Sequence, residues 1–459
     1  MTIWQPNLSD RKGPKYRGIA EAIATDMAGG TLAPGDRLPP QRNLAWTLGV
    51  TVGTISRGYA EAEKKGLVKG TVGSGTYVLP ASTRPQFAIA AEPLSGVIDM
   101  SMAAPAPGDE DIHFAAALQR MALDPNIGAL LEPPSSTLRY RAAGAAWFAR
   151  TGIDVPPERV VTTAGAQHAI AVTLSALTQA GDRVATEFLT YNGVKPVAAM
   201  LGINLEGIPI DEYGLRSDAF EDACKRGGLR ALYCVPSGHN PTTVTMPLDR
   251  RKEVADIALR YGVPIVEDDI FTSLLPDAPP PLTPMVGDLG YCLTSLSKAI
   301  APGLRIGYVT GPASMIDRLR LGVRSTCWAA TPTTAEIAAQ WIEDGTADKI
   351  QRSRQLETAA RRNILFNMLG EQTLVAAPGH VFAWMHLPDP WRANDFVAEA
   401  ARRDTRITSS EAFAVGRADP PHAVRICYGL PQTRDMLVSG LNVLAEILAA
   451  PPSSGPPII

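Results

Sequence analysis

The chain has 459 residues, of which 45% are hydrophobic and 19% charged, and its formal net charge is −3. This length predicts two or three domains, and the composition is that of an ordinary globular protein. The start of the chain is polar and no apolar run is long enough to cross a bilayer, so we expect neither a secretion signal nor membrane association.

The cysteines and histidines argue against two further classes of site. The five cysteines are scattered and never spaced as C-x-x-C, which is typical of a protein in a reducing cytoplasm without disulfides. The six histidines show no metal-ligand spacing, so we expect no metal site.

Charge is distributed unevenly along the chain. Residues 1–80 contain ten Lys and Arg against six Asp and Glu, a net charge of +4, and the remaining residues therefore carry −7. A small basic segment on an acidic remainder is expected when only that segment meets phosphate groups.

Apolar spacing and glycines within residues 1–80 predict three helices followed by a hairpin. Thr51 is placed to cap the third helix, and Gly49 to end the second. This order of elements is that of a winged helix-turn-helix. The expected helices are 16–28, 41–48 and 51–65, and the expected strands are 67–70 and 76–79.

A helix-turn-helix places its recognition helix, here the expected helix 51–65, in the major groove, while the helix before it crosses the phosphate backbone. Thr51, Thr54, Ser56 and Arg57 fall near the start of this recognition helix, and Arg42 is placed to bind a phosphate. A three-helix bundle that binds protein is the alternative.

The stretch "PGDRLPPQRNLAWTLGVTVGTISRGYAEAEKKGLVKGTVGSGTYV" resembles the DNA-binding head of GntR-type transcriptional regulators. The match includes the L-P-P-Q-R entry to the second helix and the G-x-G-T-[YF]-V wing, which contains Gly75. The resemblance implies that residues 1–80 bind double-stranded operator DNA. Val52 departs from the family, because relatives often carry arginine there.

Residues 81–96, "ASTRPQFAIAAEPLSG", lack periodicity and contain Pro, Gly and Ser, so we expect a linker. Fully extended, it would span at most about 55 Å. It separates the head from a second domain at 97–450, and the Pro- and Ser-rich tail 451–459 is expected to be disordered.

The second domain alternates apolar strands, glycine-bearing turns and amphipathic helices, as in "RVVTTAG" followed by "AQHAIAVTLSALTQAG". This alternation predicts an α/β fold around a mostly parallel sheet. Ligands of such folds bind at the carboxyl ends of the strands.

Three groups of residues fall at such strand ends. Gly165, Ala166 and Gln167 join a strand to a helix, where free N–H groups favour an anion, although glycine there is often a matter of geometry alone. Asp268 is the second of three consecutive acids at the end of "VPIVEDD", which would face solvent unless a metal or a protonated pyridine nitrogen is bound. Lys298 follows a buried strand; it is either a surface lysine or a Schiff-base lysine among phosphate ligands.

The segment "TSLSKAIAPGLRIGY" resembles the S-x-S-K-x-x-x-P-G-x-R-x-G-Y segment of fold-type I aminotransferases, and a GntR head joined to such a body is the plan of MocR-type regulators. The resemblance implies a pyridoxal 5'-phosphate cofactor, with Lys298 as the internal-aldimine lysine, and a smaller C-terminal subdomain. The implied phosphate ligands are Ser295, Ser297, Arg305 and the backbone at Gly165, Ala166 and Gln167.

The same resemblance assigns the rest of the site. In "PSGHNPTT", Asn240 would bind the phenolic oxygen of the cofactor, and in "TYNGV", Tyr191 would stack on its ring. Asp268 would pair with the pyridinium nitrogen. In "AVRICYGLP", Arg425 would hold the α-carboxylate of an amino acid with a bidentate guanidinium.

Several residues depart from the aminotransferase pattern. Ile270 and Phe271 stand where relatives carry a tyrosine that donates to the phenolic oxygen, and Thr243 replaces the glycine after N-P-T. The stretch "LLEPPSSTLR" lacks the tyrosine that helps complete the site across a dimer. Each loss removes a modest hydrogen bond, so we expect cofactor binding more than turnover.

We therefore expect a cytoplasmic, homodimeric transcriptional regulator that senses an amino acid or amine through external aldimine formation at Lys298. One alternative is a working aminotransferase with an accessory DNA-binding head. The other is a body that binds no cofactor and serves only for dimerisation.

Overall fold

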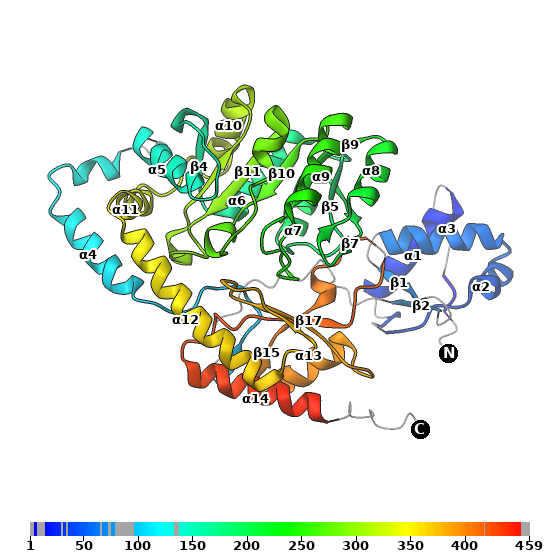
Figure 1. Cartoon of the computed structure of the whole chain (residues 1–459). Coiled ribbons are helices and arrows are strands. Elements are labelled where there is room, and N and C mark those ends of the chain that lie inside the picture. Colours follow the sequence, from blue (N-terminus) through cyan, green and yellow to red (C-terminus); the bar gives the residue numbers. More distant parts are fainter. Residues whose placement is uncertain are drawn as a thin grey trace. The chain divides into compact units, whose positions relative to one another are not determined.

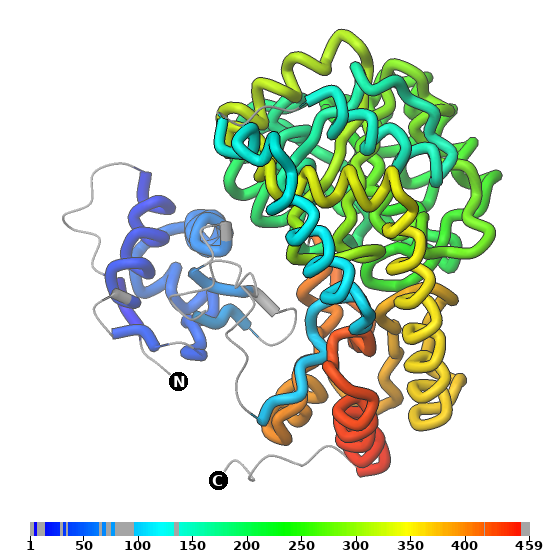
Figure 2. Tube along the Cα trace, turned by 90° about the vertical axis from the view of Figure 1, so that its left-hand side faces the viewer, coloured from blue at the N-terminus to red at the C-terminus, as the bar shows by residue number. Residues whose placement is uncertain are grey.

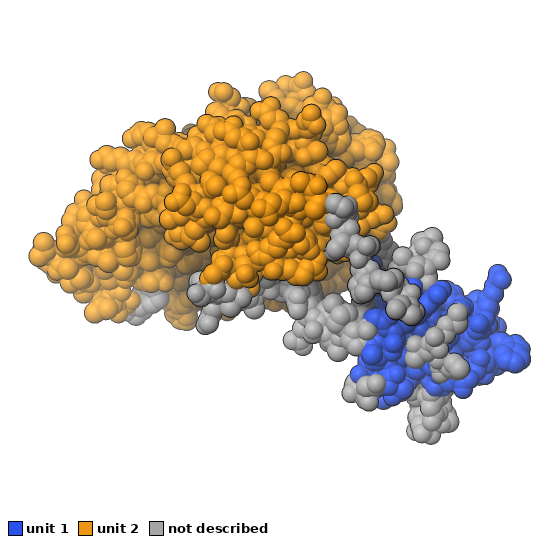
Figure 3. All heavy atoms as spheres, turned by 90° about the horizontal axis from the view of Figure 1, so that it is seen from below, with its two compact units in different colours: residues 1–89 blue, residues 90–459 orange. Residues whose placement is uncertain are grey.

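The computed structural model describes residues 4–6, 14–28, 31–33, 35–64, 67–71, 75–78, 96–132, 137–416 and 418–450. The chain divides into two compact units, residues 1–89 and 90–459 (Figure 3). Apart from Gly96, the predicted linker and tail lie outside the described residues, as does Gly66.

The first unit is a winged helix-turn-helix, as predicted (Figure 1). Its two strands pair antiparallel, and Arg37 adds an isolated bridge to Tyr77. The elements are α1 (Lys15–Ala28), α2 (Gln41–Leu48), α3 (Val52–Lys64), β1 (Val68–Thr71) and β2 (Gly75–Val78).

The orientation of α3 is set by its packing on α1. Its buried face carries Ile55, Tyr59 and Ala62, at the spacing of one helical face. Gly58 allows the close approach, because a Cβ there would lie 2.9 Å from the Cβ of Ile19. Thr51 caps the helix as predicted, since its Oγ1 accepts a hydrogen bond from the Thr54 N–H at 3.2 Å.

The second unit is built on a seven-stranded sheet, which confirms the predicted mostly parallel α/β fold. All neighbours pair parallel except β12, which is antiparallel to both β11 and β4. In sheet order the strands are β4 (Val160–Thr163), β12 (Gly307–Thr310), β11 (Gly290–Ser295), β10 (Ile265–Asp268), β9 (Leu229–Cys234), β5 (Arg183–Glu187) and β6 (Asn204–Ile208).

Helices cover both faces of this sheet, because successive strand residues point to opposite sides. Leu293 packs with α6, α7 and α10, whereas the adjacent Cys292 packs with α5 and α11 on the other face, which α8 and α9 also cover. The helices are α5 (Leu138–Ala149), α6 (Ala166–Leu177), α7 (Val194–Leu201), α8 (Ser217–Lys225), α9 (Leu248–Tyr261), α10 (Ile316–Thr326) and α11 (Pro332–Glu343).

A smaller C-terminal subdomain follows the long helix α12 (Thr346–Leu369), which Figure 2 shows as the yellow helix running from the large sheet domain into it. Its sheet has the order β13 (Leu374–Val375), β14 (Ala383–His386), β17 (Ala423–Ile426) and β16 (Thr408–Ser409). Near it, β3 (Ile98–Asp99) pairs parallel with β15 (Thr405–Arg406). The helices α13 (Ala393–Arg402) and α14 (Arg434–Ala449) pack on this subdomain.

Two further elements bear on the site and its surroundings. The helix α4 (Glu110–Ala122) leads into the short 3-10 helix η1 (Ile127–Leu131). Within the described ranges, every helix is too short or too polar to cross a membrane.

Candidate functional site

The end of β4 forms a cradle of backbone N–H groups at the start of α6. Gly165 precedes the helix with φ 88°, a conformation that favours glycine. The Arg305 guanidinium lies directly against it: a Cβ at Gly165 would be 2.7 Å from Arg305 Nη2. Helix N–H groups and an exposed guanidinium side by side suit an anion such as phosphate.

Lys298 lies in the turn after β11, together with Ser297; Ser295 ends the strand, and both serines are buried. The Oγ of Ser295 accepts a hydrogen bond from the Ser297 N–H at 3.3 Å. The half-buried amine of Lys298 donates to the carbonyl oxygen of Ala103. Burial and, next, the positive charge of Arg425 lower the pKa of Lys298 to about 8, so a larger fraction is the neutral nucleophile near neutral pH.

Asp268 ends β10 with one carboxylate oxygen left without a partner. Its Oδ2 accepts a hydrogen bond from the Tyr233 hydroxyl at 2.5 Å, whereas its Oδ1 is buried and has no partner in the described part of the chain. Burial raises the pKa of Asp268 to about 6. An unpaired, desolvated carboxylate oxygen fits a protonated ring nitrogen, which would satisfy it and restore its charge.

The three consecutive acids do not act together. Strand alternation turns Glu267 away from Asp268, and its carboxylate accepts from the backbone N–H groups of Leu282 and Thr283 at 3.0 and 2.7 Å. All three acids are buried, so the alternative of solvated acids is wrong. Over the described ranges, no three His, Cys, Asp or Glu side chains group as a metal site would require.

Arg425 on β17 reaches across to the loop that carries Asn240. Its Nη1 donates to Asn240 Oδ1 at 2.8 Å and its Nη2 to the Ser101 carbonyl oxygen at 2.5 Å. The guanidinium is buried between the rings of Phe382 and Phe413, 5.3 and 4.7 Å from their centroids. A desolvated guanidinium held this way is suited to a carboxylate.

Tyr191 lies between β5 and α7 and is fixed by Gln167. Its hydroxyl donates to Gln167 Oε1 at 3.1 Å, and Gln167 Nε2 donates to the Gly193 carbonyl oxygen at 2.6 Å. Burial, followed by the charge of Asp268, raises the pKa of Tyr191 to about 12. Through Gln167, Tyr191 joins the start of α6, where Arg305 lies against Gly165.

The departures from the aminotransferase pattern are visible in the structure. The buried ring of Phe271 lies 4.7 Å from that of His380 and 5.6 Å from that of Phe382, and offers no hydroxyl. Thr243 has φ 64°, a conformation that favours glycine, and its buried Oγ1 has no partner in the part of the chain described. The stretch at 133–136 lies outside the described residues.

Sequence reasoning missed the segment that closes the site. The carbonyl oxygens of Ser101 and Ala103 bind Arg425 and Lys298, respectively. Any residue has a carbonyl, so no sequence pattern marks these acceptors. Tyr233, the partner of Asp268, was also missed, because the pairing of β9 with β10 is visible only in the structure.

In the head, the predicted DNA-binding side chains of α2 and α3 are largely accessible. Arg42, Thr51, Ser56 and Arg57 are exposed and Thr54 is half-buried. Gly75 in the wing has φ 122°, and a Cβ there would lie 2.6 Å from Arg37 Nε, so the wing needs glycine at this point.

Trp46 on α2 is 89% exposed, an apolar surface residue that the sequence analysis did not single out.

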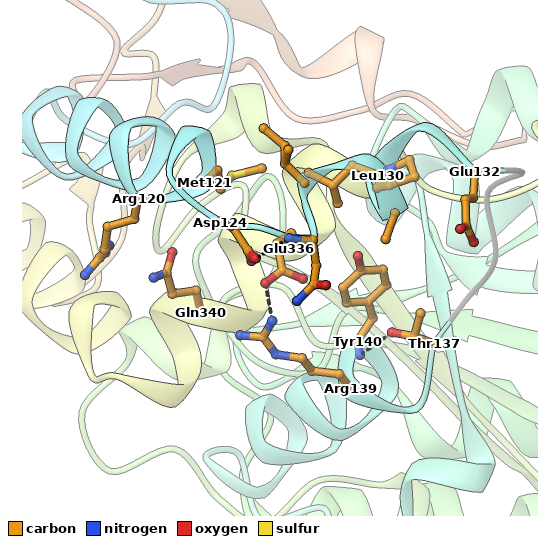
Figure 4. A pocket seen from close by; sticks show the side chains of 14 residues that line it. Arg120, Met121, Asp124, Leu130, Glu132, Thr137, Arg139, Tyr140, Glu336 and Gln340 are labelled. Carbon is orange, nitrogen blue, oxygen red and sulfur yellow. Dashed lines mark hydrogen bonds and ion pairs between the residues drawn. The ribbon is translucent and has the colours of Figure 1, made fainter.

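A cavity of about 460 Å³ lies elsewhere, between α4, η1, α5 and α11. Figure 4 shows the Arg139 guanidinium pointing toward Glu336 within it. None of the predicted site residues lines this cavity.

Comparison with known proteins supports both halves of the chain. Residues 97–441 match the family model of aminotransferase class I and II, and residues 15–78 that of bacterial regulatory proteins of the gntR family. The HTH-type transcriptional regulator YdeF of Bacillus subtilis is 29% identical over 97% of this chain and 96% of its own.

Two further proteins are similar to this chain. The vitamin B6 salvage pathway transcriptional repressor PtsJ of Salmonella typhimurium is 26% identical over 90% of this chain and 94% of its own. The crystal structure of the α-aminoadipate aminotransferase LysN of Thermus thermophilus, complexed with N-(5'-phosphopyridoxyl)-L-leucine, matches with a TM-score of 0.69 and 22% identity, over 77% of this chain and 92% of that one. The chain thus belongs to the aminotransferase class I and II family, with a GntR-family head, which is the architecture of MocR-type transcriptional regulators.

Proposed function

We propose that this protein is a cytoplasmic transcriptional regulator that binds operator DNA through residues 1–80 and senses an amino acid or amine through pyridoxal phosphate bound at Lys298. The observation that carries the proposal is the buried Oδ1 of Asp268, which has no partner among the described residues, in the same site as the amine of Lys298. A structural role alone leaves that oxygen unexplained, whereas a pyridinium N–H satisfies it.

The residues around Asp268 fit the other parts of the cofactor. The backbone at Gly165, Ala166 and Gln167 and the side chains of Ser295, Ser297 and Arg305 would hold its phosphate. Tyr191 would stack on its ring and Asn240 would bind its phenolic oxygen. The cofactor would supply an aldehyde conjugated to an electron-poor ring, to which one primary amine at a time binds covalently.

An amino-acid effector would change two contacts of one segment. Its carboxylate would take the Arg425 guanidinium from the Ser101 carbonyl oxygen. Its amine would replace that of Lys298 on the cofactor, and the released Lys298 amine would be free to donate to the Ala103 carbonyl oxygen. Lys298 donates to Ala103, so both changes act on residues 101–103. This segment follows β3, and the predicted linker to the head precedes β3 along the chain. Effector binding would therefore alter the segment that leads to the DNA-binding head.

The first test is a titration of the purified protein with pyridoxal phosphate, followed by visible absorption. The wild type should form a Schiff-base band that borohydride removes, and Lys298→Ala should not. Lys252→Ala is the matched control, because Lys252 is an exposed lysine of α9. A band of equal strength in Lys298→Ala, or none in the wild type, would contradict the cofactor part of the proposal while leaving DNA binding to be measured separately.

Sustained keto-acid production from an amino donor would favour the aminotransferase alternative. Phe271 argues against it, because no hydroxyl is available there to bind the phenolic oxygen.

Homodimerisation is also proposed. A row of exposed apolar side chains runs along α4, η1 and the start of α5, where a second copy would cover them. This apolar row consists of Ile112, Phe114, Leu118, Leu123, Ile127, Leu131 and Leu138.

A further inference from the structure

The start of α3 presents an apolar side chain where DNA-reading helices usually present polar ones. Val52 is the first residue of α3 and is 44% exposed. Val52 lies three and seven residues before Ile55 and Tyr59, so it continues their side of α3 to the first turn of the helix, where it stays exposed although they are buried. The hydroxyl of Tyr59 also donates to the Pro39 carbonyl oxygen at 2.8 Å, which ties α3 to the entry of α2.

The neighbours of Val52 favour a close approach to a groove. Gly53 is exposed, and a Cβ there would meet only Thr51 Oγ1 at 3.8 Å, so the helix surface is bare beside Val52. Ser56 lies one turn further on the same face. The hydroxyls of Thr51 and Thr54 form a hydrogen bond with each other at 2.9 Å. Val52, which lies between them in the sequence, has no hydrogen-bonding group on its side chain.

The chemistry of the major groove then limits what Val52 can recognise. The N-terminal residues of a recognition helix contact base edges. Guanine, cytosine and adenine present only hydrogen-bonding groups there, which an apolar side chain would desolvate without replacing. The one apolar group in the major groove is the 5-methyl of thymine.

We propose that Val52 reads a thymine methyl group in each half-site of the operator. This inference rests on the proposed DNA-binding function and deepens it. In relatives with arginine at this residue position, the arginine would favour guanine at the corresponding base pair. Valine in place of arginine would therefore change the preferred base from guanine to thymine.

The test begins with selection of binding sites from a random-sequence DNA pool by the full-length wild type, Val52→Ala and Val52→Arg. The wild type should enrich a site with a fixed thymine, and Val52→Arg should replace that preference with guanine at the same or the adjacent pair. All three should fold alike, since Val52 lies outside the core.

Deoxyuridine then isolates the methyl group, because it pairs like thymidine and lacks only the 5-methyl. Replacing this thymine in one half-site should weaken wild-type binding about fourfold, as expected for about 0.8 kcal/mol per buried methylene. Val52→Ile should keep this sensitivity, and Val52→Ala should lose it.

Equal sensitivity to deoxyuridine in the wild type and Val52→Ala, or none at any thymine in the wild type, would overturn the inference. Failure of the wild type to enrich any sequence would instead overturn the DNA-binding function itself, and the inference with it. The two failures are therefore distinguishable.

Discussion

Asp268 is held in the site against the preference of a carboxylate for water. Its folded pKa of about 6 lies above the ordinary value near 4, so between these two pH values the folded state keeps a proton that the unfolded state has lost. This group therefore stabilises the fold less as the pH rises. We expect the ligand-free wild type to lose about 1 kcal/mol relative to Asp268→Asn between about pH 5 and about pH 7.5.

Chemical denaturation of the cofactor-free proteins at both pH values measures this difference. The asparagine side-chain oxygen still accepts a hydrogen bond from the Tyr233 hydroxyl, but asparagine has no titratable proton in this pH range. The comparison also cancels Glu187 and Asp269, whose pKa values burial raises to about 7 and about 8 in both proteins. Parallel stability curves would show that Asp268 does not carry the proton.

Thr243 is a second residue under strain. A β-branched residue at φ 64° costs about 1–2 kcal/mol, and its buried Oγ1 has no partner among the described residues. Thr243→Gly removes both costs but gives up one methyl contact and makes the unfolded chain more flexible. We expect a net gain of about 1 kcal/mol in the free energy of unfolding, measured with urea. Thr243→Ala, which keeps a Cβ, should gain less.

At this scale family motifs in the sequence name the candidate side chains, and the structure places Asp268, Ser295 and Gly165 at or just after the carboxyl ends of β10, β11 and β4. The sequence could not predict the acceptors of Arg425 and Lys298, because main-chain carbonyls at Ser101 and Ala103 carry no residue-specific signal. That Asp268 keeps an unpaired oxygen depends on a neighbouring strand, which a single sequence does not reveal.

Among the elements, helix α9 supports the loop that carries Asn240 through one buried side chain. Arg251 Nε donates to the Met246 carbonyl at 2.9 Å, and its Nη2 donates to the Pro236 carbonyl at 3.1 Å and to Ser237 Oγ at 2.8 Å. Both Pro236 and Met246 flank Asn240 in the sequence. The loop is therefore held at both ends by one guanidinium.

Arg251→Met should lower the free energy of unfolding by about 3–5 kcal/mol, because it strands buried carbonyls and the Glu267 carboxylate 3.9 Å away. It should also weaken pyridoxal phosphate binding by loosening the Asn240 loop. Arg260→Met, on the same helix, is the control: its ion pair with Glu221 is exposed, and its loss should cost at most about 1 kcal/mol. If Arg251→Met and Arg260→Met lowered the free energy of unfolding equally, the role given to Arg251 would be contradicted.

The elements themselves were largely predictable. Helical spacing and the Thr51 cap marked α3, and its packing on α1 follows from Ile55 and Tyr59. The direction of β12 was not predictable, because "IGYVT" has the same apolar pattern whichever way the strand runs. Strand order likewise depends on crossovers that local sequence does not encode.

For the whole molecule, the apolar row along α4 and η1 is the proposed dimer surface. Leu123 and Leu131 are 83% and 90% exposed, which is costly for a monomer in water. A charge buried in an interface without a partner costs several kcal/mol, so Leu123→Glu should shift the protein from dimer to monomer in analytical ultracentrifugation. Leu356→Glu, an equally exposed leucine on α12, should leave the dimer intact. A wild-type monomer would refute the proposal directly.

Coupling between effector binding and DNA binding is the whole-molecule consequence of the proposed function. If an effector changes the affinity for DNA by some factor, DNA must change the affinity for the effector by the same factor, commonly 5- to 150-fold. In the proposed mechanism the two halves of an amino acid would act on different contacts: its amine would displace Lys298 from the cofactor, and its carboxylate would take Arg425 from Ser101. The decarboxylated amine of an active effector should therefore still change the absorption spectrum but shift operator affinity less. Fluorescence anisotropy with labelled operator measures the shift in operator affinity caused by the amino acid and the shift caused by its amine.

In Arg425→Lys the amino acid should behave like its amine, because lysine cannot bind a carboxylate with two parallel hydrogen bonds. An amine that shifts operator affinity as far as the amino acid would show that coupling does not pass through Arg425.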